Sequence, residues 1–243
     1  MFRSSNPALR TDYFRDLAGT ASGDEAMTVN GTANKTGLLL LILVTGATLT
    51  WSGNPSTMGG LAMLGGIGGF IAAMVTIFKK EYARYTAPVY AFLEGLFIGA
   101  ISSIFAARYP GIVQEAVLLT FGTAGAMLLA YRSGMIKVTQ KFRLGVFAAT
   151  GGIAIAYFLG WIMSFFGVNI SFLWGGGGMF GILFNLFVVG IAALNLVMDF
   201  DFIEEAAEYG APKYMEWYGA FGLMVTLIWL YIEFLRLLSR LQE

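Results

Sequence analysis

The chain has 243 residues, of which 57% are hydrophobic and only 12% are charged, whereas soluble domains are about 25% charged. Basic and acidic residues are balanced at 15 each, so no basic surplus exists to hold nucleic acid phosphates, and we expect no nucleic acid partner. The absence of Cys and His excludes disulfides, iron–sulfur clusters and thiolate zinc sites, and any proton chemistry must use carboxylates, Lys or Tyr.

The first 35 residues are polar and mixed, without the continuous apolar run of a signal peptide. We interpret residues 1–35 as a cytoplasmic arm and residues 36–243 as a membrane domain.

Seven apolar runs follow the arm, and each is long enough, at about 20 residues, to cross the hydrocarbon core of a bilayer. The sequence therefore predicts an all-α polytopic membrane protein, a bundle of seven transmembrane helices embedded in lipid. We place the spans near residues 36–52, 57–78, 87–107, 112–131, 145–166, 178–199 and 217–238.

The distribution of Lys and Arg between the connections predicts the orientation. The arm is basic, the second connection carries Lys79, Lys80 and Arg84, and the fourth also carries basic residues, whereas the alternate connections hold almost none. Because basic residues in short loops mark the cytoplasmic side, we predict a cytoplasmic amino terminus and, after seven spans, an external carboxyl terminus. We expect the inner (plasma) membrane of the cell.

Glycine is abundant, with 32 residues, and six glycines fall in the second span. We interpret these glycines as sites of close helix packing. A phosphate-binding loop is excluded because no Lys followed by Ser or Thr stands at the required spacing. The six are Gly59, Gly60, Gly65, Gly66, Gly68 and Gly69.

Few ionisable residues fall at membrane depth, where each costs roughly 2.5 to 3.5 kcal/mol on insertion scales. Glu94 lies seven residues into the third span and either joins two helices or lines an ion path. Asp199 and Asp201 end the predicted sixth span and project about 200° apart on a helix, so only one faces the bundle interior. Asp199 is the better interior candidate, although the pair could simply mark the water interface.

Other polar residues in the last two spans favour structural roles. Asn185 and Asn195 are expected to bond to neighbouring helices. Glu233 and Arg236 are three residues apart, which predicts a local ion pair near the outer surface.

Two stretches, KKEYARYTAPVYAFLEGLFIGAISSIF and AALNLVMDFDFIEEAAEYGAPKYMEWYGAFGLMVTLIWLYIEFLRLL, carry a family resemblance. With the seven-span layout, they make residues 36–238 similar to the bacterial branch of the Bax inhibitor-1 family, also called the transmembrane Bax-inhibitor-motif family. The resemblance implies helical hairpins around a central last helix, and a pH-sensitive calcium leak channel or, in some bacterial members, a modulator of a membrane-bound protease.

The resemblance also implies roles for particular residues. Asp199 matches a sixth-helix Asp that shares a proton with a last-helix Asp, and Lys79 or Lys80 stands where a basic residue latches the closed state. Arg236 matches a family Arg near the outer end of the last helix. Counting back from Arg236, the last-helix Asp falls at Thr226, which cannot titrate, so the two-aspartate sensor is not intact.

Asp201, Glu94 or Glu216 would then have to substitute for the missing Asp. The leading hypothesis is a Ca²⁺ leak pathway gated by carboxylate protonation, with no fixed metal site assigned. The alternative is a non-conducting modulator that binds a membrane protease or another membrane partner through the arm. We expect no enzyme and no cofactor, since HExxH, Cys and GxGD elements are lacking.

Overall fold

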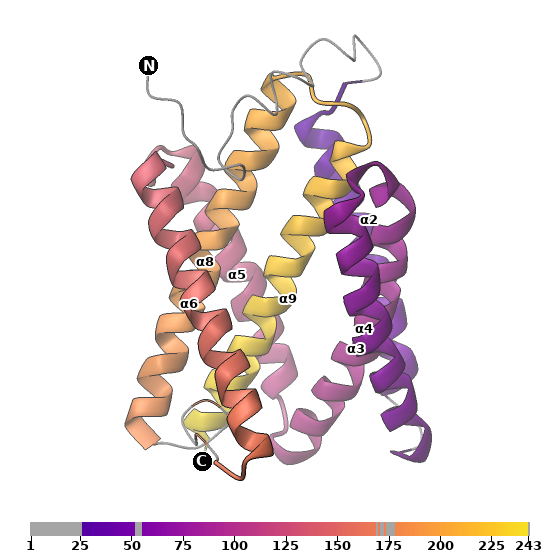
Figure 1. Cartoon of the computed structure of the whole chain (residues 1–243), viewed down its shortest axis with the longest axis vertical. Coiled ribbons are helices and arrows are strands. Elements are labelled where there is room, and N and C mark those ends of the chain that lie inside the picture. Colours follow the sequence, from indigo (N-terminus) through magenta and orange to yellow (C-terminus); the bar gives the residue numbers. More distant parts are fainter. Residues whose placement is uncertain (1–25, 52–54, 169, 171–172, 174–177, 243) are drawn as a thin grey trace. The chain divides into compact units, whose positions relative to one another are not determined.

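A computed structural model describes residues 26–51, 55–168, 170, 173 and 178–242. Residues 1–25 of the predicted arm lie outside the described residues. The helices, labelled in Figure 1, are α2 (Val29–Trp51), α3 (Pro55–Phe78), the short 3₁₀ helix η3 (Lys80–Tyr82), α4 (Ala83–Arg108), α5 (Ile112–Arg132), α6 (Gln140–Phe165), α8 (Gly178–Glu208) and α9 (Met215–Leu241).

The described part of the chain contains seven helices that are long and apolar enough to cross a membrane. Outside the helices, its β-structure is limited to an isolated antiparallel bridge between Ala26 and Pro212. The prediction of an all-helical, seven-span membrane protein is therefore confirmed. Of the seven spans, α9 has the largest buried share, 56% of its most apolar window, as expected for a helix with neighbours on several sides.

Two helix ends differ from the prediction by more than the others. α2 begins at Val29, seven residues before the predicted start of the first span, because polar side chains in its first turns find partners within the protein. The Lys35 ammonium contacts the Glu216 carboxylate at the start of α9, and the Thr32 and Thr36 hydroxyls donate to the carbonyls of Thr28 and Thr32, at 3.0 and 2.9 Å. α8 continues to Glu208, so Asp199 and Asp201 lie within a helix and not at its end.

The chain divides into two compact units. The first comprises the described residues up to Ala100 together with Asp201–Met224, and the second comprises Ile101–Phe200 with the described residues from Val225 onward. α4, α8 and α9 each contribute to both units.

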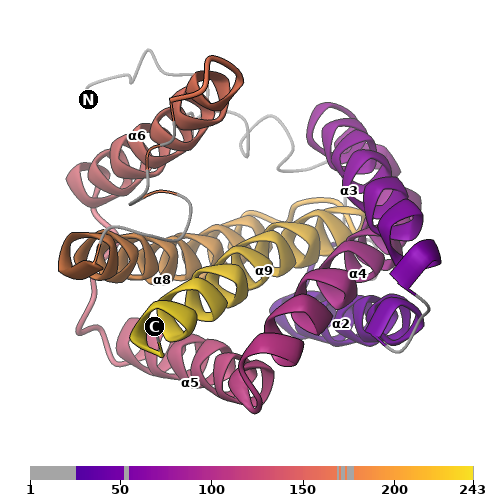
Figure 2. The same cartoon turned by 90° about the horizontal axis from the view of Figure 1, so that it is seen from below.

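Glycines allow close helix packing in the first unit, where Figure 2 shows α2 and α3 beside α4. A Cβ atom placed on Gly95 of α4 would lie only 2.2 Å from the Leu43 carbonyl oxygen of α2, and one on Gly99 would lie 2.2 Å from that of Ala47. The glycines are four residues apart and occupy one helix face, the small-xxx-small arrangement of membrane helix pairs.

The glycines of the predicted second span separate into two groups in α3. A Cβ atom on Gly65 would lie 2.5 Å from the Leu93 carbonyl oxygen of α4, and Gly69 faces Glu94 of the same helix. By contrast, a Cβ atom on Gly59 or Gly60 would meet nothing within 4 Å. The packing interpretation is therefore confirmed for Gly65 and Gly69 but not for every glycine.

Polar contacts join helices within the second unit. The Asn195 amide of α8 donates to the Thr150 hydroxyl of α6 at 2.8 Å, and the Ser102 and Tyr231 hydroxyls of α4 and α9 are 2.7 Å apart. The prediction that Asn195 bonds to a neighbouring helix is confirmed.

Candidate functional site

Asp199 lies on the part of α8 that belongs to the second unit, opposite Thr226 of α9. The Thr226 hydroxyl donates a hydrogen bond to the Asp199 carboxylate. The other carboxylate oxygen, Oδ2, is buried and has no hydrogen-bond partner among the described residues. The structure thus brings together the two positions at which the family resemblance implies a proton-sharing aspartate pair, with Thr at one of them.

Asp201 follows two residues later on α8, in the first unit, and is half-buried. Residues two apart on a helix project roughly 200° apart. The two aspartates therefore point in different directions, as the sequence predicted.

Glu94 is half-buried on α4 and its carboxylate packs against α3. Its Oε2 atom would lie 2.9 Å from a Cβ atom built on Gly69. The carboxylate therefore occupies space that is free because Gly69 has no side chain. The side chain is therefore turned toward a neighbouring helix, as a carboxylate that joins two helices would be.

The basic pair at the end of α3 occupies two environments. Lys79 is exposed, whereas the Lys80 ammonium lies 5.1 Å from the centre of the Tyr218 ring of α9. Such a cation–π contact tethers the connection between α3 and α4 to the start of α9. The role of either lysine as a latch for the closed state stays a prediction.

Glu233 of α9 is only 1% exposed and forms the centre of a polar cluster in the second unit. Arg236 Nη1 is 3.3 Å from Glu233 Oε1, which confirms the predicted ion pair. Two further donors reach the carboxylate, the Tyr157 hydroxyl of α6 at 3.2 Å and the Asn185 amide of α8 at 2.7 Å. The prediction that Asn185 bonds to a neighbouring helix is confirmed as well.

The cluster is larger than the predicted local ion pair, and its carboxylate is buried. Glu233 is held by three helices, and the Arg236 guanidinium also lies 5.3 Å from the centre of the Tyr157 ring. Nothing in the sequence around Tyr157 pointed to this contact. One turn further along α9, Arg240 donates to the Gly181 carbonyl oxygen of α8.

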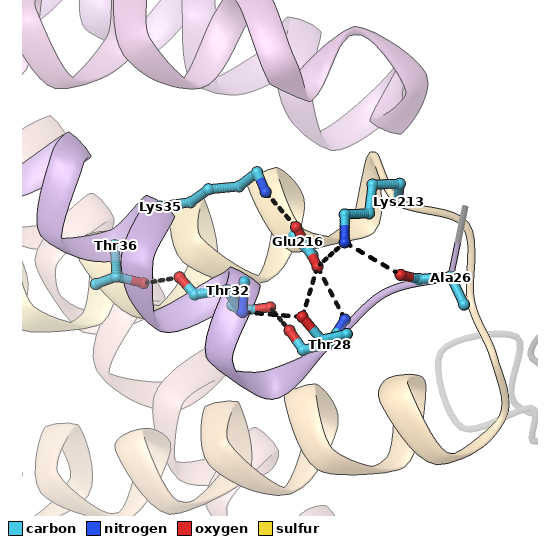
Figure 3. Close-up of polar contacts among 8 residues, drawn as sticks. Ala26, Thr28, Thr32, Lys35, Thr36, Lys213 and Glu216 are labelled. Carbon is cyan, nitrogen blue, oxygen red and sulfur yellow. Dashed lines mark hydrogen bonds and ion pairs between the residues drawn. The ribbon is translucent and has the colours of Figure 1, made fainter. Parts of the chain in front are cut away.

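Glu216, in the first turn of α9, is the centre of a second polar cluster, in the first unit (Figure 3). Its carboxylate is fully buried and accepts hydrogen bonds from the Thr28 backbone N–H and hydroxyl, both at 2.9 Å. Lys213 Nζ is 3.1 Å from Oε1, and Lys35 Nζ contacts Oε2. We call Thr28, Lys35, Lys213 and Glu216 the Glu216 cluster.

Sequence reasoning missed the Glu216 cluster because Lys35 and Glu216 are 181 residues apart. Lys35 entered the sequence reasoning only as one of the basic residues of the arm, and Glu216 only as one of three possible substitutes for the missing last-helix Asp. The available signal was the polar stretch VNGTANK, which begins α2 with a Lys that nothing local neutralises.

Among the described residues, no group of three or more acidic side chains converges in a way that could hold a metal ion. A tight Ca²⁺ site needs six to eight oxygen ligands, as a rule.

A comparison with protein families gives a match to the family described as "Bax inhibitor 1 like", over residues 6–243. A comparison with curated proteins gives no match. The family match spans every described helix, and it includes the residues of both polar clusters and Asp199.

Proposed function

We propose, from the premise that this chain belongs to the Bax inhibitor 1 like family, that this multi-pass integral membrane protein is a leak pathway for cations, foremost Ca²⁺. We further propose that protonation of Asp199 opens the pathway.

The observation that carries the proposal is the surroundings of Asp199. An ionised carboxylate at membrane depth needs a partner, a proton or water, and Asp199 has one hydroxyl donor, Thr226, while its Oδ2 atom stays unpartnered. A buried carboxylate with so few hydrogen-bond donors can gain or lose a proton when the conditions around it change. Carboxylate and carbonyl oxygens are also the ligands that Ca²⁺ prefers.

The proposed closed state holds ionised Asp199 close to a basic residue of the second connection, Lys79 or Lys80. Protonation removes that attraction, so flux rises on acidification. Thr226 makes the transition shallow, because one proton controls it and not a coupled pair.

The test is calcium entry into dye-loaded liposomes that contain only the purified protein, between about pH 6 and 8. Asp199→Asn should leak at neutral pH and lose most of its pH dependence. Thr226→Asp restores the aspartate that the family resemblance implies and should steepen the transition. Equal, pH-independent flux in wild type and Asp199→Asn would remove Asp199 from the gate.

Two further carboxylates, Glu94 and Asp201, are candidates for the pathway. The same flux assay tests whether each takes part. Glu94→Gln should leave the protein folded but alter the flux if Glu94 lines the pathway. Asp201→Asn makes the same charge change two residues from Asp199 on another face of α8, so it should keep the pH dependence unless Asp201 takes part.

For orientation, we propose that the amino terminus is cytoplasmic and the carboxyl terminus external, in the inner (plasma) membrane. The support is the Lys and Arg asymmetry of the connections together with seven helices of spanning length. A reporter fused after Glu243 should behave as external. A cytoplasmic signal from that fusion would refute the orientation.

The alternative is a non-conducting modulator that contacts a membrane protease or another membrane protein through residues 1–25. Deleting those residues keeps Ala26 and Thr28, which contact Lys213 and Glu216. A leak pathway should keep its flux after this deletion. A modulator should lose its partner and show no flux with or without the segment.

A further inference from the structure

We infer that Glu216 is the anchor of a strap, formed by residues 26–28 directly before α2, that fastens the amino-terminal arm to the connection between α8 and α9. The strap is a conformational device that opens only when the Glu216 carboxylate is released. This inference concerns the first unit alone and does not depend on whether the protein conducts ions.

Backbone pairing holds the strap on the connection. Ala26 and Pro212 form the antiparallel bridge, and the Met27 N–H donates to the Ala211 carbonyl oxygen at 2.7 Å. The Met27 side chain is 2% exposed and packs in a cluster of buried residues with Ile203, Ala206, Ala211 and Met215. The strap is therefore a packed part of the protein, although it contributes only one bridge and one buried side chain.

Glu216 supplies the specific fastening. Its carboxylate, 0% exposed, accepts hydrogen bonds from the backbone N–H and the hydroxyl of Thr28 at the end of the strap, and it pairs with Lys35 and Lys213. Lys213 Nζ also lies 3.5 Å from the Ala26 carbonyl oxygen at the other end of the strap. A buried carboxylate is stable only while such donors stay in place, so its burial and the closed strap require each other.

Glu216 carries the only negative charge of the cluster, and the closed strap depends on it. Two ammonium groups flank one carboxylate, and they belong to different segments, Lys35 to α2 and Lys213 to the connection. Without the carboxylate, the two positive charges would repel each other, although water weakens this repulsion because the Lys213 side chain is 49% exposed, and they would favour separation of α2 from the connection. Loss of either lysine alone leaves a paired carboxylate, which is a smaller perturbation.

The first turns of α2 are shaped to admit this carboxylate. A Cβ atom on Gly31 would lie 2.1 Å from Glu216 Oε1 and 2.4 Å from Cδ, so a side chain there would expel the carboxylate. At Gly37 in the same helix, a Cβ atom would meet nothing within 4 Å. Alanine at these two positions therefore gives a matched pair of variants, since both make the same chemical change and only one disturbs Glu216.

The experiment uses the lack of native cysteine. Ala26→Cys and Pro212→Cys introduce one thiol on each side of the bridge. Residues opposite each other in an antiparallel pair have Cα atoms about 4.5–5.5 Å apart, within the roughly 4.4–6.8 Å that a disulfide spans. The full-length double-cysteine protein is reconstituted into liposomes, and the rate of disulfide formation under mild oxidation is followed by mass spectrometry.

The parent double-cysteine protein should cross-link rapidly. Glu216→Gln and Gly31→Ala should each slow cross-linking by on the order of tenfold, equivalent to about 1.4 kcal/mol in favour of the open strap, whereas Gly37→Ala should match the parent. Lys35→Met should have a smaller effect than Glu216→Gln.

Two results would overturn the inference. One is a parent protein that fails to cross-link, since the strap would then not be closed. The other is an equal rate in the Gly31→Ala and Gly37→Ala proteins, because Glu216 would then play no part in the closure. If Glu216→Gln does not fold, the comparison of the two alanine variants decides the question, as both retain every charge of the cluster.

Discussion

The contact between α2 and α4 gives the sharpest test of the packing described above. In the Gly95→Ala protein, the new Cβ atom would lie 2.2 Å from the Leu43 carbonyl oxygen, 3.0 Å from the Leu43 carbonyl carbon and 3.1 Å from the Ala47 nitrogen. These are backbone atoms, which cannot rotate away as a side chain can. To restore an ordinary contact of 3.4 Å, α2 must retreat by at least 1.2 Å over this stretch.

The magnitude follows from two opposing terms. Overpacking of a well-packed interface costs typically about 1–3 kcal/mol, and the backbone contact places Gly95→Ala near the upper value. Alanine favours the helix over glycine by about 1 kcal/mol. The expected net loss is therefore about 2 kcal/mol, or roughly 4–8 °C in melting temperature for a chain of this size.

The assay is thermal unfolding of the purified protein in detergent, with Gly122→Ala as the matched control. Gly122 lies on α5, where a Cβ atom would meet nothing within 4 Å, so alanine should leave the melting temperature unchanged or raise it slightly. Gly99→Ala should behave like Gly95→Ala. A Gly95→Ala protein that melts at the same temperature as the Gly122→Ala protein would refute the close approach of α2 and α4.

Three further predictions concern polar contacts within the second unit, each measured as melting temperature in detergent. Arg236→Met should cost more than Glu233→Gln, because the Glu233 side chain alone is 2% exposed and would keep a buried charge, while the Arg236 side chain, 31% exposed, can reach water. Tyr231→Phe should cost about 1 kcal/mol by removing the bond to Ser102, and an unchanged melting temperature would argue against that bond. Asn195→Leu should cost only about 0.6 kcal/mol, the average for interhelical hydrogen bonds in membranes, and a much larger loss would indicate a role beyond its bond to Thr150.

The sequence by itself determined the seven spans, because the length of an apolar run and the thickness of a bilayer are enough to specify them. It also determined the ion pair of Glu233 and Arg236, since residues three apart on a helix are neighbours whatever the rest of the chain does. Apolarity alone, however, placed the start of α2 too late. The polar turns from Val29 to Lys35 are stabilised by contacts that no local pattern encodes.

Only the tertiary structure decided which faces of distant helices meet. It placed the Thr226 hydroxyl on Asp199, brought Tyr157 and Asn185 to Glu233, and joined Lys35 to Glu216 across 181 residues. Which side chains meet depends on how helices rotate and cross, and that is set by the packing of many small and apolar residues together.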